Sequence, residues 1–237
     1  MSPQAEISPG TSAVVLLSAG LDSTFNLLKA LEKFSVRMVL TFNYGQKAAA
    51  PEVERSARLA KHYNLRHEVV ELPWFAKFTR SALLTRESVP SEGEVEIDNL
   101  RRSLETAKAV WVPNRNGIFL NIAAGFAEGL GAGVVIPGFN MEEAQTFPDN
   151  SGGFLQALNA SWAFSTDSGV RTHCFSTEMN KTQIVEDAKR MRLPFHMLWP
   201  CYLPGPRWCG SCESCRRFER AIEANGMDFN KLREEAG

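Results

Sequence analysis

The first group of residues that could do chemistry is Ser18-Ala19-Gly20-Leu21-Asp22-Ser23-Thr24, directly after the apolar run at 14–17. The run predicts a buried strand, and the polar residues after it predict a sharp turn into a helix. Gly20 allows a turn whose N–H groups point inward, and such a nest at a helix N-terminus attracts phosphate. Ser18 and Ser23 add hydroxyl donors, and Asp22 could hold a metal ion that bridges phosphate oxygens. The open alternative is an ordinary strand–turn–helix capped by Ser or Asp.

The second group is a set of cysteines near the C-terminus with the spacing C-x7-C-x2-C-x2-C: Cys201, Cys209, Cys212 and Cys215. Four thiolates suit tetrahedral zinc and close its coordination sphere, so the predicted ion is structural and does not activate water. The alternatives are two disulfides or buried free thiols. Residues 1–10 show no signal-peptide pattern, which favours a reducing compartment and the zinc interpretation. Cys174 lies in an apolar stretch, 171–175, and is expected to be a core residue of a strand.

Composition excludes several broad classes of protein. The 237 residues include 26 Lys+Arg and 27 Asp+Glu, a net charge of −1, with 44% hydrophobic and 22% charged residues. This balance is typical of a soluble globular chain and gives no support to a broad nucleic-acid or membrane surface. The sequence has no apolar run long enough to span a membrane, so we expect a cytoplasmic protein.

Apolar periodicity predicts alternating strands and helices, which indicates an α/β fold with a mostly parallel sheet and sites at the carboxyl ends of its strands. Asn180 is the predicted N-cap of the last of these helices. The region 73–110 breaks the alternation with Pro, Gly and acidic residues, and is expected to be a long excursion, either a lid or an oligomer contact. The predicted strands are 14–17, 37–42, 67–71, 134–136 and 171–175, and the predicted helices are 24–33, 52–63, 117–130, 153–164 and 180–191.

The expected domain organisation follows from these patterns. Residues 1–12 should form a flexible N-terminus, and 13–195 an α/β domain that carries the phosphate-binding loop and includes the variable excursion. Residues 196–237 should form a small zinc-binding segment with a terminal helix.

The loop after the first strand resembles the S-x-G-x-D-S pyrophosphate loop of the ATP pyrophosphatase superfamily, whose members split ATP between the α and β phosphates. It lacks the Lys-Ser/Thr ending of a Walker P-loop, which argues against γ-phosphate chemistry. Together with the cysteine cluster it resembles the 7-cyano-7-deazaguanine synthases of the queuosine pathway, over residues 13–226. The matching stretches are 18–24, 41–46, 112–116, 147–149, 180–185 and 199–202, followed by the four cysteines.

The resemblance implies a three-layer α/β sandwich of the PP-loop, adenine nucleotide alpha hydrolase-like type and an ATP-dependent ligase. Such an enzyme adenylates the carboxylate of 7-carboxy-7-deazaguanine, lets ammonia displace AMP to give the amide, and adenylates the amide oxygen to leave the nitrile. The implied cofactors are ATP, Mg²⁺ and structural Zn²⁺. The implied partners are the deazaguanine acid, ammonia and a second copy of the chain, without a membrane or nucleic acid.

The resemblance also implies site residues. Catalysis would involve Ser18, Asp22, Ser23, Arg115 and Lys181. Without the resemblance, Lys181 and Arg115 would be assigned to the solvated surface. Nucleotide would contact Leu16, Ser18, Ala19, Gly20, Leu21, Asp22, Ser23, Thr24, Phe42, Gln46, Arg115 and Lys181.

Recognition of the deazaguanine acid is implied for Asn116, Gly138, Asn140, Phe147 and Asp149. The Phe147 ring could stack on the base, and the Asp149 carboxylate could accept from its N1–H and 2-amino group. The alternative is that Phe147 belongs to the core and Asp149 only caps a turn.

Several positions depart from the family's usual residues: Ala19 and Asn114 replace Gly, Ala144 replaces Tyr, Gln145 replaces Ser, Asn150 replaces Cys and Pro200 replaces Ser. Ala19 could restrict how closely the backbone meets phosphate. The chain is therefore either a divergent synthase or a paralogue that stops at the amide or joins the acid to another amine, conceivably on a protein. Two hypotheses of other classes are a tRNA-thiolating enzyme, which would need Cys174 as its catalytic cysteine, and a non-catalytic zinc-stabilised binding module.

Overall fold

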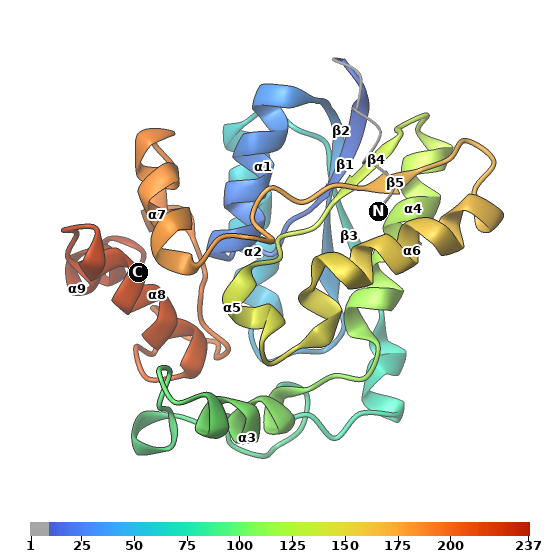
Figure 1. Cartoon of the computed structure of the whole chain (residues 1–237). Coiled ribbons are helices and arrows are strands. Elements are labelled where there is room, and N and C mark those ends of the chain that lie inside the picture. The colour runs from blue at the N-terminus through green and yellow to red at the C-terminus, as the bar shows by residue number, and fades with distance from the viewer. Residues whose placement is uncertain (1–9) are drawn as a thin grey trace.

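The computed structural model of the chain describes residues 10–237 and is built around one five-stranded sheet (Figure 1). All neighbouring strands are parallel, in the order β3-β2-β1-β4-β5. Of the expected flexible N-terminus, residues 1–9 lie outside the described residues, and β1 already begins at Ser12. The strands are β1 (Ser12–Leu16), β2 (Ser35–Asn43), β3 (His67–Glu71), β4 (Val134–Ile136) and β5 (Arg171–Thr172).

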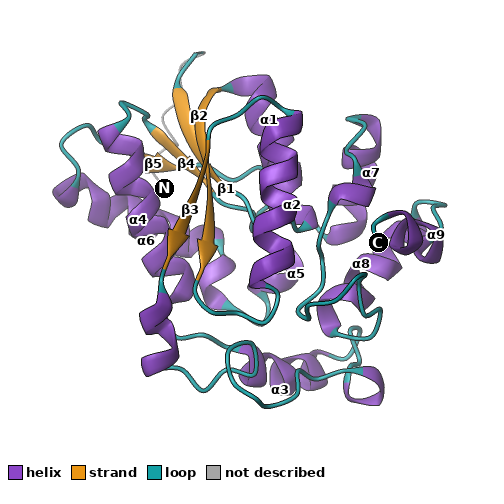
Figure 2. Cartoon of the chain, turned by 180° about the vertical axis from the view of Figure 1, so that it is seen from behind, coloured by secondary structure: helices purple, strands orange, loops and turns teal. Residues whose placement is uncertain are grey.

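Helices cover both faces of the sheet, which confirms the predicted three-layer α/β sandwich. On one face lie α1 (Leu21–Lys33) and α2 (Ala49–His62), and on the other lie α4 (Arg115–Gly129) and α6 (Gly152–Ser165) (Figure 2). Successive residues of β1 point to opposite faces, as the pleat of a strand requires. Ala13 and Val15 therefore pack in the core beneath α1 and α2, and Val14 packs in the core on the other side.

Three helices, α1, α2 and α4, begin two or three residues earlier than the apolar periodicity predicts, whereas α6 and α7 begin within one residue of their predicted starts. The first turn of α2, for example, contains Pro51, whose missing N–H has no partner to lose at that position. The periodicity does not register these first turns because, apart from Leu21, their residues are polar or small.

Strand β5 is shorter than predicted, because it ends at Thr172 and not at Phe175. The N–H of His173 still donates to the Val135 carbonyl at 3.0 Å, but the next residue able to pair from the β4 side is Pro137, which has no N–H. Phe175 donates instead to the side chain of Asn26 on α1, at 2.8 Å. The prediction that Cys174 lies in a strand is therefore wrong.

The excursion over 73–110 is ordered and packs along the lower side of the sheet (Figure 1). It contains the short 3-10 helices η1 (Pro73–Lys77) and η2 (Glu92–Glu94) and a helix that the sequence analysis missed, α3 (Leu100–Val110). Ser91 forms a β-bridge with Cys212, so the excursion contacts the segment that carries the four cysteines, residues 201–215.

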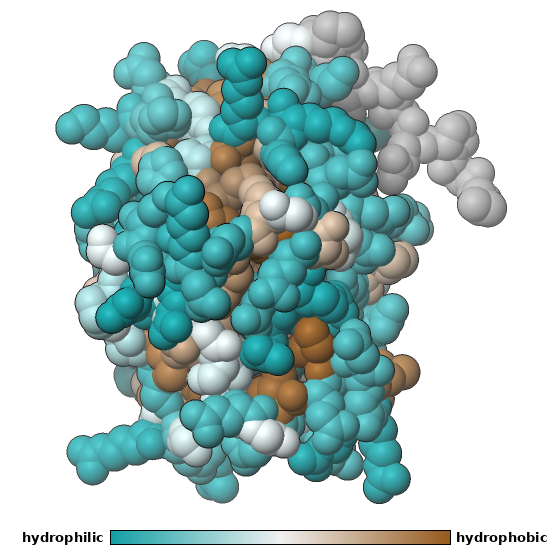
Figure 3. Space-filling model, turned by 90° about the vertical axis from the view of Figure 1, so that its left-hand side faces the viewer, coloured by the Kyte–Doolittle hydropathy of each residue, from teal (hydrophilic) through white to brown (hydrophobic). Residues whose placement is uncertain are grey.

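The C-terminal part contains α7 (Lys181–Arg190), which packs on α1, α8 (Glu213–Ala224), which packs on α7, and α9 (Phe229–Glu235), which packs on α8. Asn180 caps α7 as predicted and forms a capping box with Gln183. The face that carries these helices is mostly hydrophilic, with small apolar areas divided by polar side chains (Figure 3). No helix within residues 10–237 has the length and apolar character needed to cross a bilayer. The remaining elements are α5 (Met141–Ala144), η3 (Pro148–Asn150) and η4 (Phe195–Met197).

Candidate active site

A cavity opens at the carboxyl ends of the strands, where the strand order reverses between β1 and β4. Open parallel sheets bind ligands at such a switch point, because the loops after the two strands diverge there. Its walls come from the loop after β1, from Pro137 and Gly138 after β4, from the end of β2 and from the segment around Cys201.

The loop after β1 is held by hydrogen bonds between its own hydroxyl and backbone groups. The Ser23 hydroxyl lies 3.2 Å from the Ser18 hydroxyl, accepts from the Ser18 N–H and donates to the Gly20 carbonyl. Helix α1 begins directly afterwards with Gly20 as its N-cap. The N-terminal N–H groups of this 13-residue helix therefore face the cavity that Ser18, Gly20 and Ser23 line.

The residue that needs a special backbone conformation in this loop is Ala19 and not Gly20. Ala19 has φ 57°, whereas Gly20 has φ −71°. The Ala19 side chain is fully buried in the core beneath α1 and α2, so its methyl group faces away from the cavity. The burial of the Ala19 methyl group argues against the expectation that Ala19 restricts the approach of phosphate, which stays a prediction to be tested.

Lys181 lies buried between two carboxylates that line the same cavity. Its Nζ is 2.8 Å from Asp22 Oδ2 and 2.8 Å from Glu143 Oε1. Burial lowers the pKa of Lys181, but the two carboxylates outweigh burial and raise this pKa above its usual range. Burial raises the pKa of Asp22 more than Lys181 lowers it, and Asp22 Oδ1 has no hydrogen-bond partner among the described residues. Asp22 is therefore in a position to bind a further cation.

Arg115 lies at the start of α4 and also lines the cavity. Its Nη1 donates to the Tyr44 hydroxyl at 3.4 Å, and its Nε to Asn116 Oδ1 at 3.3 Å. Burial lowers the pKa of Arg115, but Tyr44 and Asp149 outweigh burial and raise it. The Arg115 guanidinium stays positively charged, and it has no carboxylate within 4.0 Å among the described residues.

Gly138 brings β4 and α1 close together at the floor of the cavity. A Cβ atom at Gly138 would lie 2.4 Å from the backbone N of Ser23 and 2.8 Å from the carbonyl carbon of Asp22. Backbone atoms cannot move aside as side chains do, so this position requires glycine for space.

One side of the cavity is apolar and contains a single carboxyl group. Phe42 and Phe119 stack with ring centroids 4.1 Å apart, next to Leu40. The half-buried Glu52 accepts a hydrogen bond from Gln46 Nε2 at 2.8 Å. Burial raises the pKa of Glu52 to about 7, above its ordinary value of 4.5, although Gln46 and Arg115 lower it in part.

The structure brings most of the sequence-predicted residues to this cavity. Those that line it are Leu16, Ser18, Gly20, Leu21, Asp22, Ser23, Phe42, Gln46, Arg115, Asn116, Gly138 and Lys181, together with the departures Asn150 and Pro200.

Five predicted residues do not line the cavity: Ala19, Thr24, Asn140, Phe147 and Asp149. The Phe147 ring stacks on Trp111 at 6.0 Å, and the Asp149 carboxylate acts on Arg115. The Asn140 side chain is fully buried and caps α5 by accepting from the Glu143 N–H. The side chains of Phe147, Asp149 and Asn140 therefore lie behind the residues that line the cavity.

Sequence reasoning missed Glu143, Glu52 and Tyr202, all of which line the cavity. For Glu143 a signal existed, since it lies directly before the departures Ala144 and Gln145. For Glu52 no signal existed, because an acidic residue in the first turn of an amphipathic helix is ordinary.

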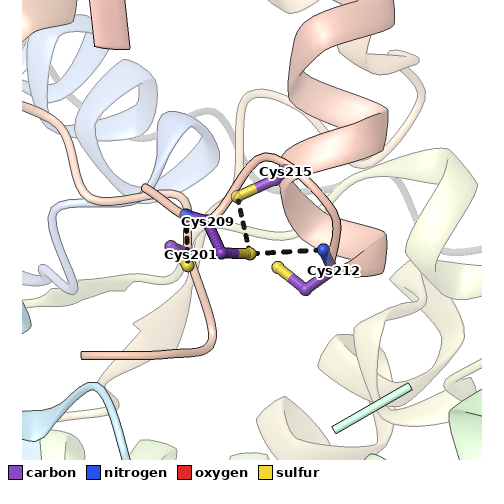
Figure 4. A group of neighbouring side chains, drawn as sticks. All are labelled: Cys201, Cys209, Cys212 and Cys215. Carbon is purple, nitrogen blue, oxygen red and sulfur yellow. Dashed lines mark hydrogen bonds between the residues drawn. The ribbon is translucent and has the colours of Figure 1, made fainter. Parts of the chain in front are cut away.

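The four C-terminal cysteines converge, with all four sulfur atoms within 4.8 Å of one another (Figure 4). Cys209 Sγ lies 3.9 Å from Cys215 Sγ, close to the separation of about 3.8 Å expected for sulfurs at 2.3 Å around a tetrahedral ion. Backbone N–H groups of Leu203 and Cys209 point at Cys201 Sγ, which favours the thiolate form. The cluster can hold a metal ion, and Cys201 also lines the cavity.

Cys174 stands apart from the cluster, half-buried between Asn26 and the Phe139 carbonyl. Burial raises the pKa of its thiol. A protonated thiol is a poor nucleophile, so its surroundings do not activate Cys174.

Comparisons with known proteins agree on one family. The chain matches the family described as Queuosine biosynthesis protein QueC over residues 12–226. It is 52% identical over 221 residues to the 7-cyano-7-deazaguanine synthase of Bdellovibrio bacteriovorus, covering 92% of this chain and 96% of that protein. It is 48% identical to the protein of the same name from Desulforudis audaxviator, covering 90% of this chain and 97% of the relative.

A solved structure supports the fold alone. The U34-tRNA thiolase NcsA from Methanococcus maripaludis matches with a TM-score of 0.51 at 12% identity, covering 98% of this chain and 75% of that one.

Proposed function

Because the chain belongs to the QueC family of queuosine biosynthesis proteins, we propose that it is a 7-cyano-7-deazaguanine synthase. It uses ATP to convert 7-carboxy-7-deazaguanine through an acyl-adenylate and an amide to the nitrile, releasing AMP and pyrophosphate. The observation that carries the proposal is the convergence of Ser18, Ser23, Asp22, Lys181 and Arg115 on one cavity at the switch point. The relatives give no reason to prefer the paralogue, the tRNA-thiolating or the non-catalytic hypothesis.

The loop after β1 binds the pyrophosphate side of ATP. The N–H groups at the start of α1 and the hydroxyls of Ser18 and Ser23 point into the cavity there, and they are already ordered by their mutual hydrogen bonds. Donors held in place before charge develops stabilise the transition state without reorganisation.

Asp22 and Glu143 would hold Mg²⁺, because carboxylate oxygens are its preferred protein ligands and Asp22 Oδ1 is buried without a partner. The ion supplies charge neutralisation on the phosphate oxygens when it is bound. Lys181 then acts as a fixed ammonium that both carboxylates keep protonated.

Arg115 orients the carboxylate of the acid toward the α-phosphate. A guanidinium can bind a carboxylate or a phosphate through two parallel N–H groups, and the position of Arg115 beside Tyr44 and Asn116 fixes the plane of that fork. Holding the two reactants in this way turns adenylation into an effectively unimolecular step.

The four cysteines hold structural Zn²⁺, which fits their four-sulfur donor set and leaves no open position for water. Four cysteines used as zinc ligands and Cys174 as a lone thiol fit a reducing compartment such as the cytoplasm. Ammonia is the nitrogen donor. The exposed rings of Trp74 and Phe78, whose centroids lie 5.8 Å apart, support a homodimer in which a second copy covers them.

The test is a mass-spectrometric product assay with purified protein, ATP, Mg²⁺ and 7-carboxy-7-deazaguanine, with and without ammonia. The proposal expects nitrile and AMP when ammonia is present. Amide alone, or a deazaguanine mass added to a protein, would support the paralogue instead. Unchanged acid without AMP would refute ATP-dependent activation of this acid altogether.

Lys181 gives a sharp control for this assay. Lys181→Met should lower kcat/KM for ATP by about 100-fold or more, since it removes the ammonium next to the phosphate side. Lys189→Met, on the exposed side of the same helix, is the matched variant and should change kcat/KM less than twofold. Equal effects of both changes would mean that Lys181 acts only through helix stability, which circular dichroism on both variants would reveal.

A further inference from the structure

Three carboxyl groups line the active-site cavity, and they differ in whether a positively charged side chain contacts them. Asp22 and Glu143 both contact Lys181 at 2.8 Å. The Glu52 side chain has no ion pair within 4.0 Å among residues 10–237, and its only side-chain hydrogen bond there is the one that its Oε2 accepts from Gln46. Glu52 Oε1 is therefore available to a ligand.

Glu52 lies beside the aromatic part of the cavity lining, because Gln46 Nε2 donates both to the Phe42 carbonyl and to Glu52. The paired rings of Phe42 and Phe119 lie on this side of the cavity, and its other apolar lining residues are Leu40, Ala48 and Leu83. An apolar slot with one polar group at its edge is typical of a site for a nitrogen heterocycle, because stacking gives affinity and the polar group gives orientation.

Gln46 cannot recognise a ring directly, because its own polar atoms already have partners. Gln46 Oε1 accepts from the Tyr44 N–H at 3.0 Å, and its Nε2 donates to the Phe42 carbonyl and to Glu52. The amide therefore fixes the end of β2 and the orientation of the Glu52 carboxyl group.

We propose that Glu52 recognises the N1 and 6-amino edge of the adenine of ATP and thereby determines which nucleotide the enzyme accepts. The inference rests on the proposed ATP-dependent function and adds the residue that selects the base. Glu52 binds through its carboxylic acid form: Oε1–H donates to adenine N1, and Oε2 accepts from the 6-amino group.

Gln46 makes this arrangement selective. Because its N–H donates to Oε2, the proton is favoured on Oε1, so the carboxyl group presents a donor and an acceptor in a fixed order. Guanine presents the opposite order, with an N–H at N1 and a carbonyl oxygen at C6. In a guanine nucleotide the N1–H would face Oε1–H and the C6 oxygen would face Oε2, so neither hydrogen bond could form.

The electrostatic surroundings favour the protonated form near neutral pH. Burial raises the pKa of Glu52 to about 7, and the ionisable groups that act on it from other elements are Arg115 on α4, which lowers its pKa, and Tyr44 at the end of β2. The affinity for ATP should therefore fall as the pH rises above about 7.

The experiment compares Glu52→Leu with Glu52→Gln, whose amide keeps one donor and one acceptor. Binding of a non-hydrolysable ATP analogue is measured by calorimetry, and KM for ATP and for the acid by pyrophosphate release. Glu52→Leu should weaken nucleotide binding about tenfold or more and leave KM for the acid unchanged. Glu52→Gln should recover most of this loss and remove the dependence of ATP affinity on pH between 6 and 8.

Wild-type protein gives a second measurement that does not depend on the folding of a variant. Purine riboside triphosphate, which lacks the 6-amino group, should bind at least about fivefold more weakly than ATP to the wild type but equally to Glu52→Leu. Equal binding of both nucleotides by the wild type would overturn the inference, as would a rise in KM for the acid alone. Calorimetry measures nucleotide binding without turnover. Absence of nitrile in the product assay would therefore refute the proposed function without deciding whether Glu52 recognises adenine.

Discussion

Two residues with left-handed backbone conformations lie at the edge of the active site, and both stand where the family usually has glycine. Ala19 has φ 57° and Asn114 has φ 53°. This conformation costs a residue with a Cβ roughly 1 kcal/mol, and Asn tolerates it better than most. The departures therefore keep the backbone path that glycine would take, and they change only what the side chain contacts.

Ala19→Gly tests whether the methyl group matters for phosphate binding. Because the Cβ is buried beneath α1 and α2, we expect KM for ATP to change less than twofold. The free energy of unfolding should change by less than about 1 kcal/mol, since relief of the left-handed strain offsets the lost burial. Steady-state kinetics and urea denaturation measure the two quantities. A fivefold fall in KM would show that the methyl group does obstruct the nucleotide.

Glu52 gives a prediction for stability against pH. Its folded-state pKa of about 7 lies above its ordinary value of 4.5, so the stability it contributes is fully present below pH 4.5 and is lost as the pH rises through 7. Between pH 5 and 8 the ligand-free protein should lose about 2–3 kcal/mol through this residue. Glu52→Gln should lack that decline, and urea denaturation of both proteins across this range gives the difference. Parallel pH profiles would show that Glu52 titrates normally.

At the scale of elements, the site depends on how closely β4 and α1 approach. The first turn of α1 passes directly over Gly138, and the N–H of Trp199 donates to the Ala19 carbonyl at 2.8 Å from the other side. The loop after β1 is thus held between two segments that are more than a hundred residues away in sequence. Its position is a property of the packed elements and not of the loop alone.

Gly138→Ala should disturb this contact. A methyl group 2.4 Å from a backbone nitrogen forces β4 and α1 apart, which we expect to cost about 1–3 kcal/mol of unfolding free energy and at least tenfold in kcat/KM for ATP. Gly125→Ala is the matched change, because Gly125 is exposed inside α4 and no atom lies within 4 Å of its added Cβ. It should be neutral or stabilise by up to about 1 kcal/mol. Thermal and urea unfolding compare the two, and equal stabilities would contradict the close approach.

At the scale of the whole molecule, the segment that carries the four cysteines, residues 201–215, contacts both the excursion and the C-terminal helix. The excursion reaches it through the bridge between Ser91 and Cys212, and Thr106 donates to Glu213 at 3.1 Å. From the C-terminus, Arg233 donates to the carbonyl groups of Trp208 and Cys209. A metal ion in the cluster would therefore hold together one wall of the cavity.

Removing the metal should loosen that wall before the sheet unfolds. We expect one zinc ion per chain by elemental analysis, and we expect its chelation to lower the Tm by several degrees and to expose residues 78–99 and 196–212 to protease. Cys174→Ser is the control and should leave the metal content unchanged, because Cys174 lies outside the cluster. A protein that carries no zinc, or that keeps its Tm without it, would contradict a structural metal.

The sequence by itself determined the features that local spacing encodes. The parallel α/β sandwich follows from apolar periodicity, the N-cap at Asn180 from residue type, and the convergence of the four cysteines from their short spacing. The family resemblance added residues distant in sequence, such as Lys181 and Arg115, and both line the cavity.

Only the tertiary structure decided which side chains reach the cavity and what charge they carry there. Phe147 and Asp149 lie behind the wall, while Glu52 and Glu143 lie on it, because distant elements set the direction of each side chain. The two carboxylate partners of Lys181 come from α1 and α5, and the raised pKa of Glu52 arises from its burial in the folded protein. Spacing along the chain does not contain these quantities, since they depend on which surfaces pack together and how much water they exclude.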